Sequence, residues 1–250
     1  MNEQKIIILV DNLLYEGDLK MQEGNLAEAN IIYQKAKDNA KKLLNGLNAG
    51  YAIACDKLGD VARFSGEFRK AHELYDQALP IFSALASSNI EYQRDVSLCL
   101  SKIGELALAE NDISTAREAL EAHYEMAKHI AARDLSHFEH QRDLAGAHGR
   151  LQQLEMASEN FTEALKHAES AHTILEKLIV INPGNVSLVQ DVAGSNYMLG
   201  IILMRTGDEK RAASVLKDSL QILRDLGKQG KLDAKGKRLL KHLNDFKLMP

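Results

Sequence analysis

The sequence has no tryptophan, only three prolines and only two cysteines among its 250 residues. So little proline argues against a loop-rich or β-sandwich chain, and two cysteines are too few for a disulfide scaffold. Cys55 and Cys99 each lie in an apolar stretch, which predicts buried, reduced thiols in a cytoplasmic protein. The longest apolar run, Ile6 to Val10, is far too short to cross a bilayer, so we expect neither a membrane partner nor a secretion signal.

The sequence also has no large excess of acidic or of basic residues. The formal net charge is -4, and 26% of the residues are charged, as in an ordinary soluble folded protein. Without a global basic field, no nucleic acid partner is expected. The segment 228–250 carries +5, which leaves -9 on the rest of the chain. A solvated helix face is the preferred interpretation of that segment, over nucleic acid or acidic lipid binding, because aromatic residues for stacking are scarce there.

Catalytic motifs are missing as well. The sequence contains no phosphate-binding glycine loop, no Gly-x-Ser-x-Gly, no His-Glu-x-x-His and no Cys-x-x-Cys. We therefore predict that the protein is not an enzyme and has no catalytic residue and no cofactor. His137 and His140, with His129 and His148 nearby, invite a metal hypothesis. No acidic or cysteine ligand has a fixed spacing to them, so capping or solvent-facing histidines are preferred and no metal is expected.

What the sequence does have is an internal repeat. Five segments align on the anchor positions Gly17, Gly59, Gly104, Gln152 and Gly200, at spacings of 42, 45, 48 and 48 residues. Twelve residues after each anchor stands an alanine: Ala29, Ala71, Ala116, Ala164 and Ala212. Apolar residues recur with helical periodicity around these columns. Because two helices approach closely only where side chains are small, each repeat is predicted to be a pair of antiparallel helices.

The predicted domain organisation follows from these columns. A repeat array covers 1–227, with repeats at about 3–47, 50–88, 91–133, 138–182 and 186–227. The expected helices are 5–23 and 26–47, 51–65 and 68–87, 92–110 and 113–132, 138–158 and 162–181, and 186–206 and 209–227. A basic C-terminal segment, 228–250, holds one more amphipathic helix at about 233–247. Its apolar stripe of Leu239, Leu240, Leu243 and Phe246 is expected to cap the last repeat.

The pattern resembles the tetratricopeptide repeat family. Four anchor glycines match its first-helix glycine, the five alanines match its small position, and Tyr33 and Tyr75 match its second-helix aromatic residue. The resemblance covers about 10–225. The repeats are longer than the 34-residue standard and are similar to kinesin-light-chain-like and some bacterial arrays. It implies an all-α fold, a right-handed α-α superhelix of about five helix pairs plus a C-terminal capping helix. Gln152 departs from the pattern.

The family resemblance also implies the function. Such arrays bind proteins or peptides on a concave surface lined by the first helices, without catalysis. The partner-binding candidates are Asp18, Met21, Asp56, Asp60, Arg63, Phe64, Glu105, Leu108, Gln153, Met156, Tyr197, Ile201, Met204 and Arg205. Asp11, Leu14, Gln22 and Ser101 share their positions. These residues could equally be ordinary exposed positions, and that alternative stays open.

The candidate charges point to one class of partner. Asp18, Asp56, Asp60 and Glu105 have only Arg63 as a neighbouring cation in the sequence, so the N-terminal half is expected to prefer a basic or amphipathic partner. The C-terminal half is apolar, with methionines that can adapt to a ligand. A second hypothesis is a regulatory protein that senses a peptide or ligand, or that partners an effector module. Self-association stays open.

Overall fold

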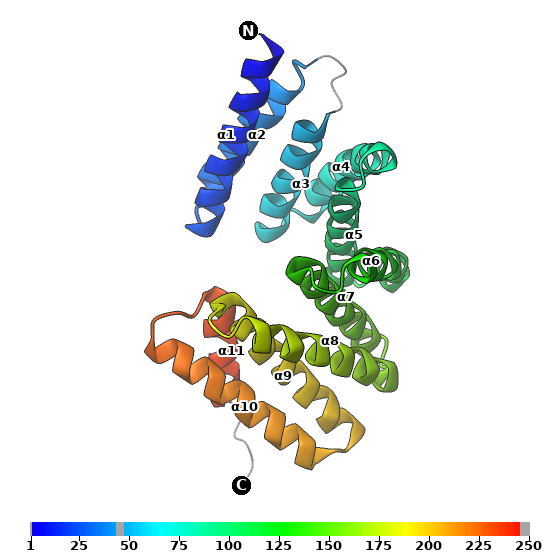
Figure 1. Cartoon of the computed structure of the whole chain (residues 1–250), viewed down its shortest axis with the longest axis vertical. Helices are drawn as coiled ribbons and strands as arrows, with labels where there is room; N and C mark the ends of the chain where they lie inside the picture. Colours follow the sequence, from blue (N-terminus) through cyan, green and yellow to red (C-terminus); the bar gives the residue numbers. More distant parts are fainter. Residues whose placement is uncertain (1, 44–47, 246–250) are drawn as a thin grey trace. The chain divides into compact units, whose positions relative to one another are not determined.

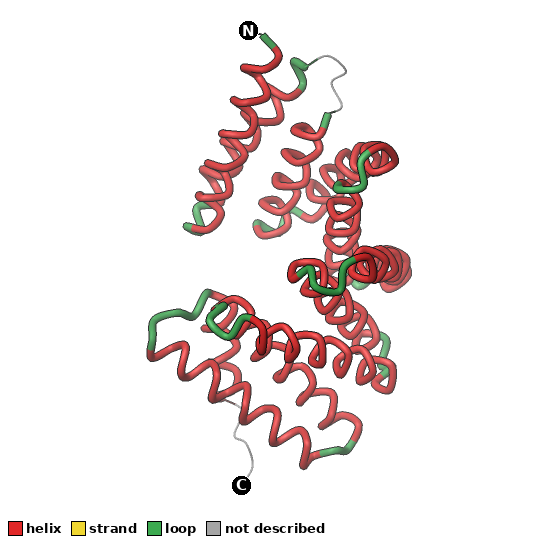
Figure 2. The backbone as a smooth tube through the Cα atoms, in the orientation of Figure 1, coloured by secondary structure: helices red, strands yellow, loops and turns green. Residues whose placement is uncertain are grey.

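The computed structural model describes residues 2–43 and 48–245, and throughout them the regular structure is helical (Figures 1 and 2). The helices are α1 Glu3–Gln22, α2 Leu26–Ala40, α3 Ala49–Phe64, α4 Phe68–Ser88, α5 Tyr92–Ala109, α6 Ile113–Arg133, α7 Phe138–Ala157, α8 Phe161–Ile181, α9 Val186–Thr206, α10 Glu209–Lys228 and α11 Ala234–Asp245. The all-α prediction is confirmed, and the helices follow one another as sequential pairs. Two predicted ends, at 44–47 and 246–247, lie outside the described residues.

One helix ends earlier than the sequence pattern predicts. α2 stops at Ala40, and residues 41–43 form a turn instead of continuing the helix. The Asn48 side chain bonds to the helix ends on both sides of this break. Its amide nitrogen donates to the Ala40 carbonyl at 2.9 Å. Its Oδ1 accepts from the Tyr51 N–H at 3.0 Å and so caps α3. A single asparagine thereby satisfies a carbonyl at the end of α2 and an amide at the start of α3.

The chain divides into two compact units, residues 1–126 (unit 1) and 127–250 (unit 2). In unit 1, α1 packs on α2, α2 on α3, α3 on α4 and α4 on α5, and α3 also contacts both α1 and α5. In unit 2, α7 packs on α8, α8 on α9 and α9 on α10, and α11 contacts α10 and α9. The alanine column is buried throughout, with each of the five side chains no more than 1% exposed.

The turn between the two helices of each pair is the same in all five repeats. The residue seven positions after the anchor has a positive φ: 77° at Gly24 and Gly66, 88° at Gly207, but also 60° at Asn111 and 59° at Glu159. The N–H of the next residue bonds to the carbonyl five residues back, at 2.8–2.9 Å in every copy. This is the left-handed C-terminal motif of helices, which favours glycine but tolerates asparagine.

Close helix crossings explain the anchor glycines. A Cβ added at Gly59 would lie 2.5 Å from the Tyr75 ring, and one at Gly200 would lie 2.5 Å from Leu216. The partner is in each case the residue sixteen positions after the anchor. In the fourth repeat the sizes are exchanged, because the anchor is Gln152 and the sixteenth residue is Ala168, and both are buried. The departure at Gln152 is therefore a redistribution of volume between two helices.

The last helix packs on the end of unit 2. Leu243 is 1% exposed and Leu232 is 9% exposed, and Leu239 and Leu240 are partly buried against the same core cluster. The Gln190 side chain of α9 accepts from the Asp233 N–H at 3.1 Å, next to the start of α11. Phe246, the fourth member of the predicted stripe, lies outside the described residues. The lysines of α11 remain exposed, as expected for the outer face of a cap.

α9 is the one helix in the described part of the chain that is long and apolar enough to cross a membrane, judged by length and composition alone. It contacts α8, α10 and α11, and it buries Leu188, Leu199, Ile202 and Leu203 against them. Apolar residues on several sides are typical of a helix in the interior of a helical array.

Candidate binding face

The first helices of unit 1 form a face that is crossed by ion pairs. α3 contacts α1 on one side and α5 on the other, so charged side chains from neighbouring repeats meet at both seams (Figure 1). We call this surface the first-helix face of unit 1. Its charged members are Asp18, Asp56, Lys57, Asp60, Arg63, Lys102 and Glu105. Four of them carry negative charge and three positive charge, so these seven side chains largely compensate one another.

The best-buried pair joins α5 to α3. Lys102 Nζ lies 2.6 Å from Asp56 Oδ2 and 2.7 Å from Asp60 Oδ2. The three side chains are 21%, 14% and 16% exposed. Burial raises the pKa of Asp56, while Lys102 opposes that shift. Burial lowers the pKa of Lys102, but the two carboxylates outweigh it and its pKa is raised overall. Lys102 therefore remains charged at neutral pH and compensates two carboxylates that would otherwise repel each other.

Two further pairs flank this one. Lys57 Nζ lies 2.8 Å from Asp18 Oδ1 across the seam between α3 and α1, where the two side chains are 32% and 41% exposed. Arg63 Nη1 lies 2.9 Å from Glu105 Oε2 across the seam between α3 and α5. The Arg63 guanidinium also sits 4.6 Å from the ring centroid of Phe64, within cation–π range.

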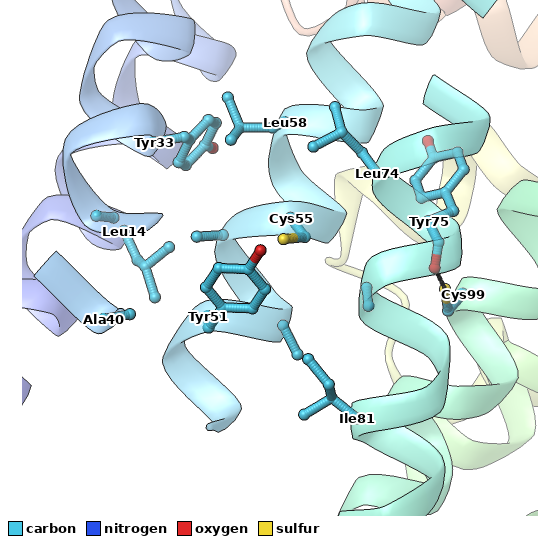
Figure 3. Close-up of a cluster of buried hydrophobic side chains, with 14 of the residues drawn as sticks. Leu14, Tyr33, Ala40, Tyr51, Cys55, Leu58, Leu74, Tyr75, Ile81 and Cys99 are labelled. Atoms are coloured by element: carbon cyan, nitrogen blue, oxygen red, sulfur yellow. Dashed lines mark hydrogen bonds between the residues drawn. The ribbon is translucent and has the colours of Figure 1, made fainter. Parts of the chain in front are cut away.

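Two of the aspartates accept hydrogen bonds from the hydroxyl groups of buried tyrosines. Tyr33 OH donates to Asp18 Oδ1 at 2.6 Å, and Tyr75 OH donates to Asp60 Oδ1 at 2.9 Å. Each tyrosine follows its aspartate by fifteen residues and is fully buried between helices (Figure 3). Burial and then the aspartate hydrogen bond raise the pKa of Tyr33. The carboxylates are thus fixed by groups from the second helix of their own repeat and from the next repeat.

The expectation that Arg63 is the only cation beside these acids is wrong. Lys57 and Lys102 both approach them, and each stands two residues before the anchor of its own repeat. From that position each lysine reaches the acid that stands one residue after the anchor of the preceding repeat, Asp18 or Asp60. The shared offset was visible in the sequence. The lateral contact between first helices, which gives the offset its meaning, was not.

The predicted candidates divide between the two units. Eight of them, from Asp18 to Leu108, lie in unit 1, and Met21 is partly buried against the core there. The other six lie in unit 2, where Gln153, Met156, Tyr197 and Ile201 are partly buried and Met204 and Arg205 are exposed. Among the residues that share these positions, Leu14 and Ser101 are wrong as surface candidates, because they are 8% and 7% exposed.

A comparable lateral pair in unit 2 was not among the candidates. Arg142 of α7 bonds to Asp191 of α9, with Nη2 at 2.6 Å and Nε at 2.8 Å from the same Oδ2. The signal was the Gln141-Arg142-Asp143 segment, which recurs one repeat later as Val189-Gln190-Asp191. The arginine of one copy binds the aspartate of the next. This recurrence links neighbouring first helices within unit 2.

Four histidines at α7 and α8 make contacts within the protein. His137 Nδ1 accepts from the His140 N–H and caps α7, and the two rings stack with centroids 3.6 Å apart. His148 Nδ1 lies 3.0 Å from His167 Nδ1 between α7 and α8, and burial followed by the charge of His167 lowers the pKa of His148 to about 4. Among residues 2–43 and 48–245, no group of three His, Cys, Asp or Glu side chains is placed to hold a metal ion.

Comparison with known proteins agrees with the repeat geometry. The family model described as "Tetratricopeptide repeat" matches residues 10–84. The match spans most of α1 to α4, so this part of the chain is identified as tetratricopeptide repeats. No curated protein sequence matches the chain.

Solved structures share the fold of this chain. BtubC (BKLC) from P. vanneervenii has a TM-score of 0.72 and 17% identity, covering 90% of this chain and 84% of that one. A Rap protein complexed with Competence and Sporulation Factor has a TM-score of 0.68 and 15% identity, covering 93% and 62%. Kinesin light chain repeats from P. anserina have a TM-score of 0.51 and 17% identity, covering 88% and 96%. At these identities the likeness concerns the fold alone.

Proposed function

We propose that this tetratricopeptide repeat protein is a non-catalytic scaffold that binds a protein or peptide on its first helices. The observation that carries the proposal is the first-helix face of unit 1. Its charged side chains are held by ion pairs and tyrosine hydroxyls, so little side-chain freedom remains to be lost when a ligand binds. Buried, reduced thiols are consistent with a cytoplasmic location, which is part of the same proposal.

The paired charges change the ligand chemistry that we favour. Asp56, Asp60 and Glu105 are already compensated by Lys102 and Arg63, so little Coulomb attraction is left for a purely basic segment. Phe64, in contrast, is 59% exposed beside these charges. An aromatic ring of this kind suits the apolar side of a ligand. We therefore favour an amphipathic segment, with apolar residues on Phe64 and a cation that competes with Lys57 for the half-exposed Asp18.

The second candidate function is a peptide- or ligand-sensing regulator. Its support is the fold shared with the Rap protein that was solved as a complex with Competence and Sporulation Factor. This chain spans 62% of that protein, so any activity that resides in the remainder of Rap is not implied here.

The proposal is tested by selecting ligands from a displayed random peptide library on the intact chain. We expect amphipathic sequences to be enriched, and Phe64→Ala to weaken the best peptide at least tenfold, or about 1.4 kcal/mol, by titration calorimetry. The matched control is Ile90→Ala, which truncates another exposed apolar side chain, 48% exposed, in the connection between α4 and α5. Equal affinities for the parent and Phe64→Ala would remove the first-helix face of unit 1 as the binding surface.

A further inference from the structure

α1 has a second apolar stripe on the side that faces away from unit 1. Its buried side consists of Ile6, Val10, Leu14 and Gly17. On the opposite side, Ile8, Tyr15 and Leu19 are 55%, 68% and 39% exposed. With the exposed Asn12 they are spaced at intervals of four, three and four residues, which aligns them along one line of a helix. This is the spacing of a helix that packs on another helix.

The outward stripe, defined as Ile8, Asn12, Tyr15 and Leu19, has an apolar residue at a similar distance on each side of Asn12, namely Ile8 and Tyr15. If two copies of α1 pack antiparallel with their Asn12 residues opposite each other, Ile8 of one copy lies across from Tyr15 of the other. The same arrangement is generated twice by the two-fold axis. Ile8 and Tyr15 then meet twice, Leu19 of each copy lies across from the aliphatic part of the other copy's Lys5, and the two asparagine amides can bond to each other at the axis.

The charges on one side of the stripe fit the same arrangement. Lys5 and Glu16 are eleven residues apart, so they lie about 20° from each other around the helix, on one side of the stripe. In the antiparallel pair this side of one copy faces the same side of the other. Lys5 of one copy then lies within about one helical turn of Glu16 of its partner, and the contact occurs twice. Both residues are exposed in the single chain.

We propose that the outward stripe of α1 is a self-association surface, and that its occupant is α1 of a second copy of this chain. The C-terminal cap is a less suitable occupant. Its exposed side chains, Lys235, Lys237, Arg238 and Lys241, are cationic, so they offer no apolar surface to Ile8 or Tyr15. The Ile8–Tyr15 contacts and the Lys5–Glu16 pairing both favour the second copy.

Sedimentation equilibrium of the full chain, over about 1 to 100 μM, measures the association directly. We expect a monomer–dimer equilibrium, and Ile8→Glu should raise its dissociation constant at least tenfold, because the change places a charge in the apolar seam. Ile8 is exposed in the monomer, so the fold of unit 1 should be unchanged by circular dichroism. Ile90→Glu, which makes the same change at an exposed isoleucine in the connection between α4 and α5, should leave the dissociation constant unchanged.

A charge exchange identifies the partner surface. Lys5→Glu and Glu16→Lys should each weaken the dimer, since each creates two like-charged contacts. A mixture of the two single variants should form a heterodimer, because both contacts are again between opposite charges. A parent chain that is monomeric at every concentration would overturn the proposal. A dimer that resists Ile8→Glu, or single variants that do not associate with each other, would overturn it as well.

Discussion

Lys102→Met is expected to lower the free energy of unfolding by about 3–5 kcal/mol at pH 7. The substitution keeps the length of the side chain but removes the cation that lies between Asp56 and Asp60. Removing one partner from a buried ion pair leaves uncompensated charge in a poorly solvated place, which costs this much in other proteins. Here two carboxylates are left facing each other. Urea denaturation, followed by the helical signal of the intact chain, measures the loss.

The loss should depend on pH in a defined direction. Burial already raises the pKa of Asp56 in the parent, and Lys102 counteracts part of that rise. Without Lys102 the folded-state pKa rises further above the unfolded value. Protonation of the Asp56 carboxyl group then favours the folded state. The loss of unfolding free energy in Lys102→Met should therefore shrink as the pH falls from 7 towards 5. Lys57→Met is the control, because its pair with Asp18 is more exposed and should cost less than about 1 kcal/mol. Equal losses for the two variants would refute the assignment of Lys102 as the central cation.

Gly200→Gln is expected to destabilise unit 2 by about 3 kcal/mol, because the new side chain enters a helix crossing that is already filled. A Cβ at Gly200 would lie 2.5 Å from Leu216 Cγ, so Leu216 or a helix must move. Leu216→Ala alone should cost about 2–5 kcal/mol through the cavity that it leaves.

The double variant Gly200→Gln with Leu216→Ala copies the arrangement of the fourth repeat, where Gln152 and Ala168 occupy the same two positions. We expect it to be more stable than the sum of the two single losses predicts, by at least about 1.5 kcal/mol. Chemical denaturation of the four proteins in a double-mutant cycle gives this coupling energy. Strictly additive losses would show that the two positions do not share one volume.

Fold class and helix order could be predicted from the sequence because columns of small residues report on helix crossings. The five alanines and the positions of the turns follow from local chemistry, and the structure confirms the helices that they predict. A single column could not show that a large residue in one column is accommodated by a small residue in another. Gln152 departs from the anchor glycines of the other repeats. Ala168, sixteen residues later, has the small side chain that makes room for it. The early end of α2 likewise depends on Asn48, which is eight residues away from the carbonyl it binds.

The candidate site was less predictable. The positions of Asp18, Asp60 and Glu105 follow from the repeat, but their electrostatic effect depends on which side chains of the next repeat reach them. Lys57 and Lys102 extend backwards along the array, and that direction is set by the packing of α1, α3 and α5. Burial was equally hidden at Leu14 and Ser101, which share the register of the exposed candidates but face the interior.

Both thiols of the chain lie in unit 1 and none lies in unit 2. Cys55 and Cys99 are fully buried, and burial raises the pKa of Cys99 to about 12, so the reactive thiolate is scarce and inaccessible in the folded state. An alkylating reagent can therefore reach them only when α3 or α5 opens. The rate of alkylation in native buffer then reports the opening free energy of unit 1 alone, because unit 2 has no cysteine that could react. Because both cysteines lie in unit 1, the native sequence itself provides a chemical probe of the stability of unit 1 inside the intact protein.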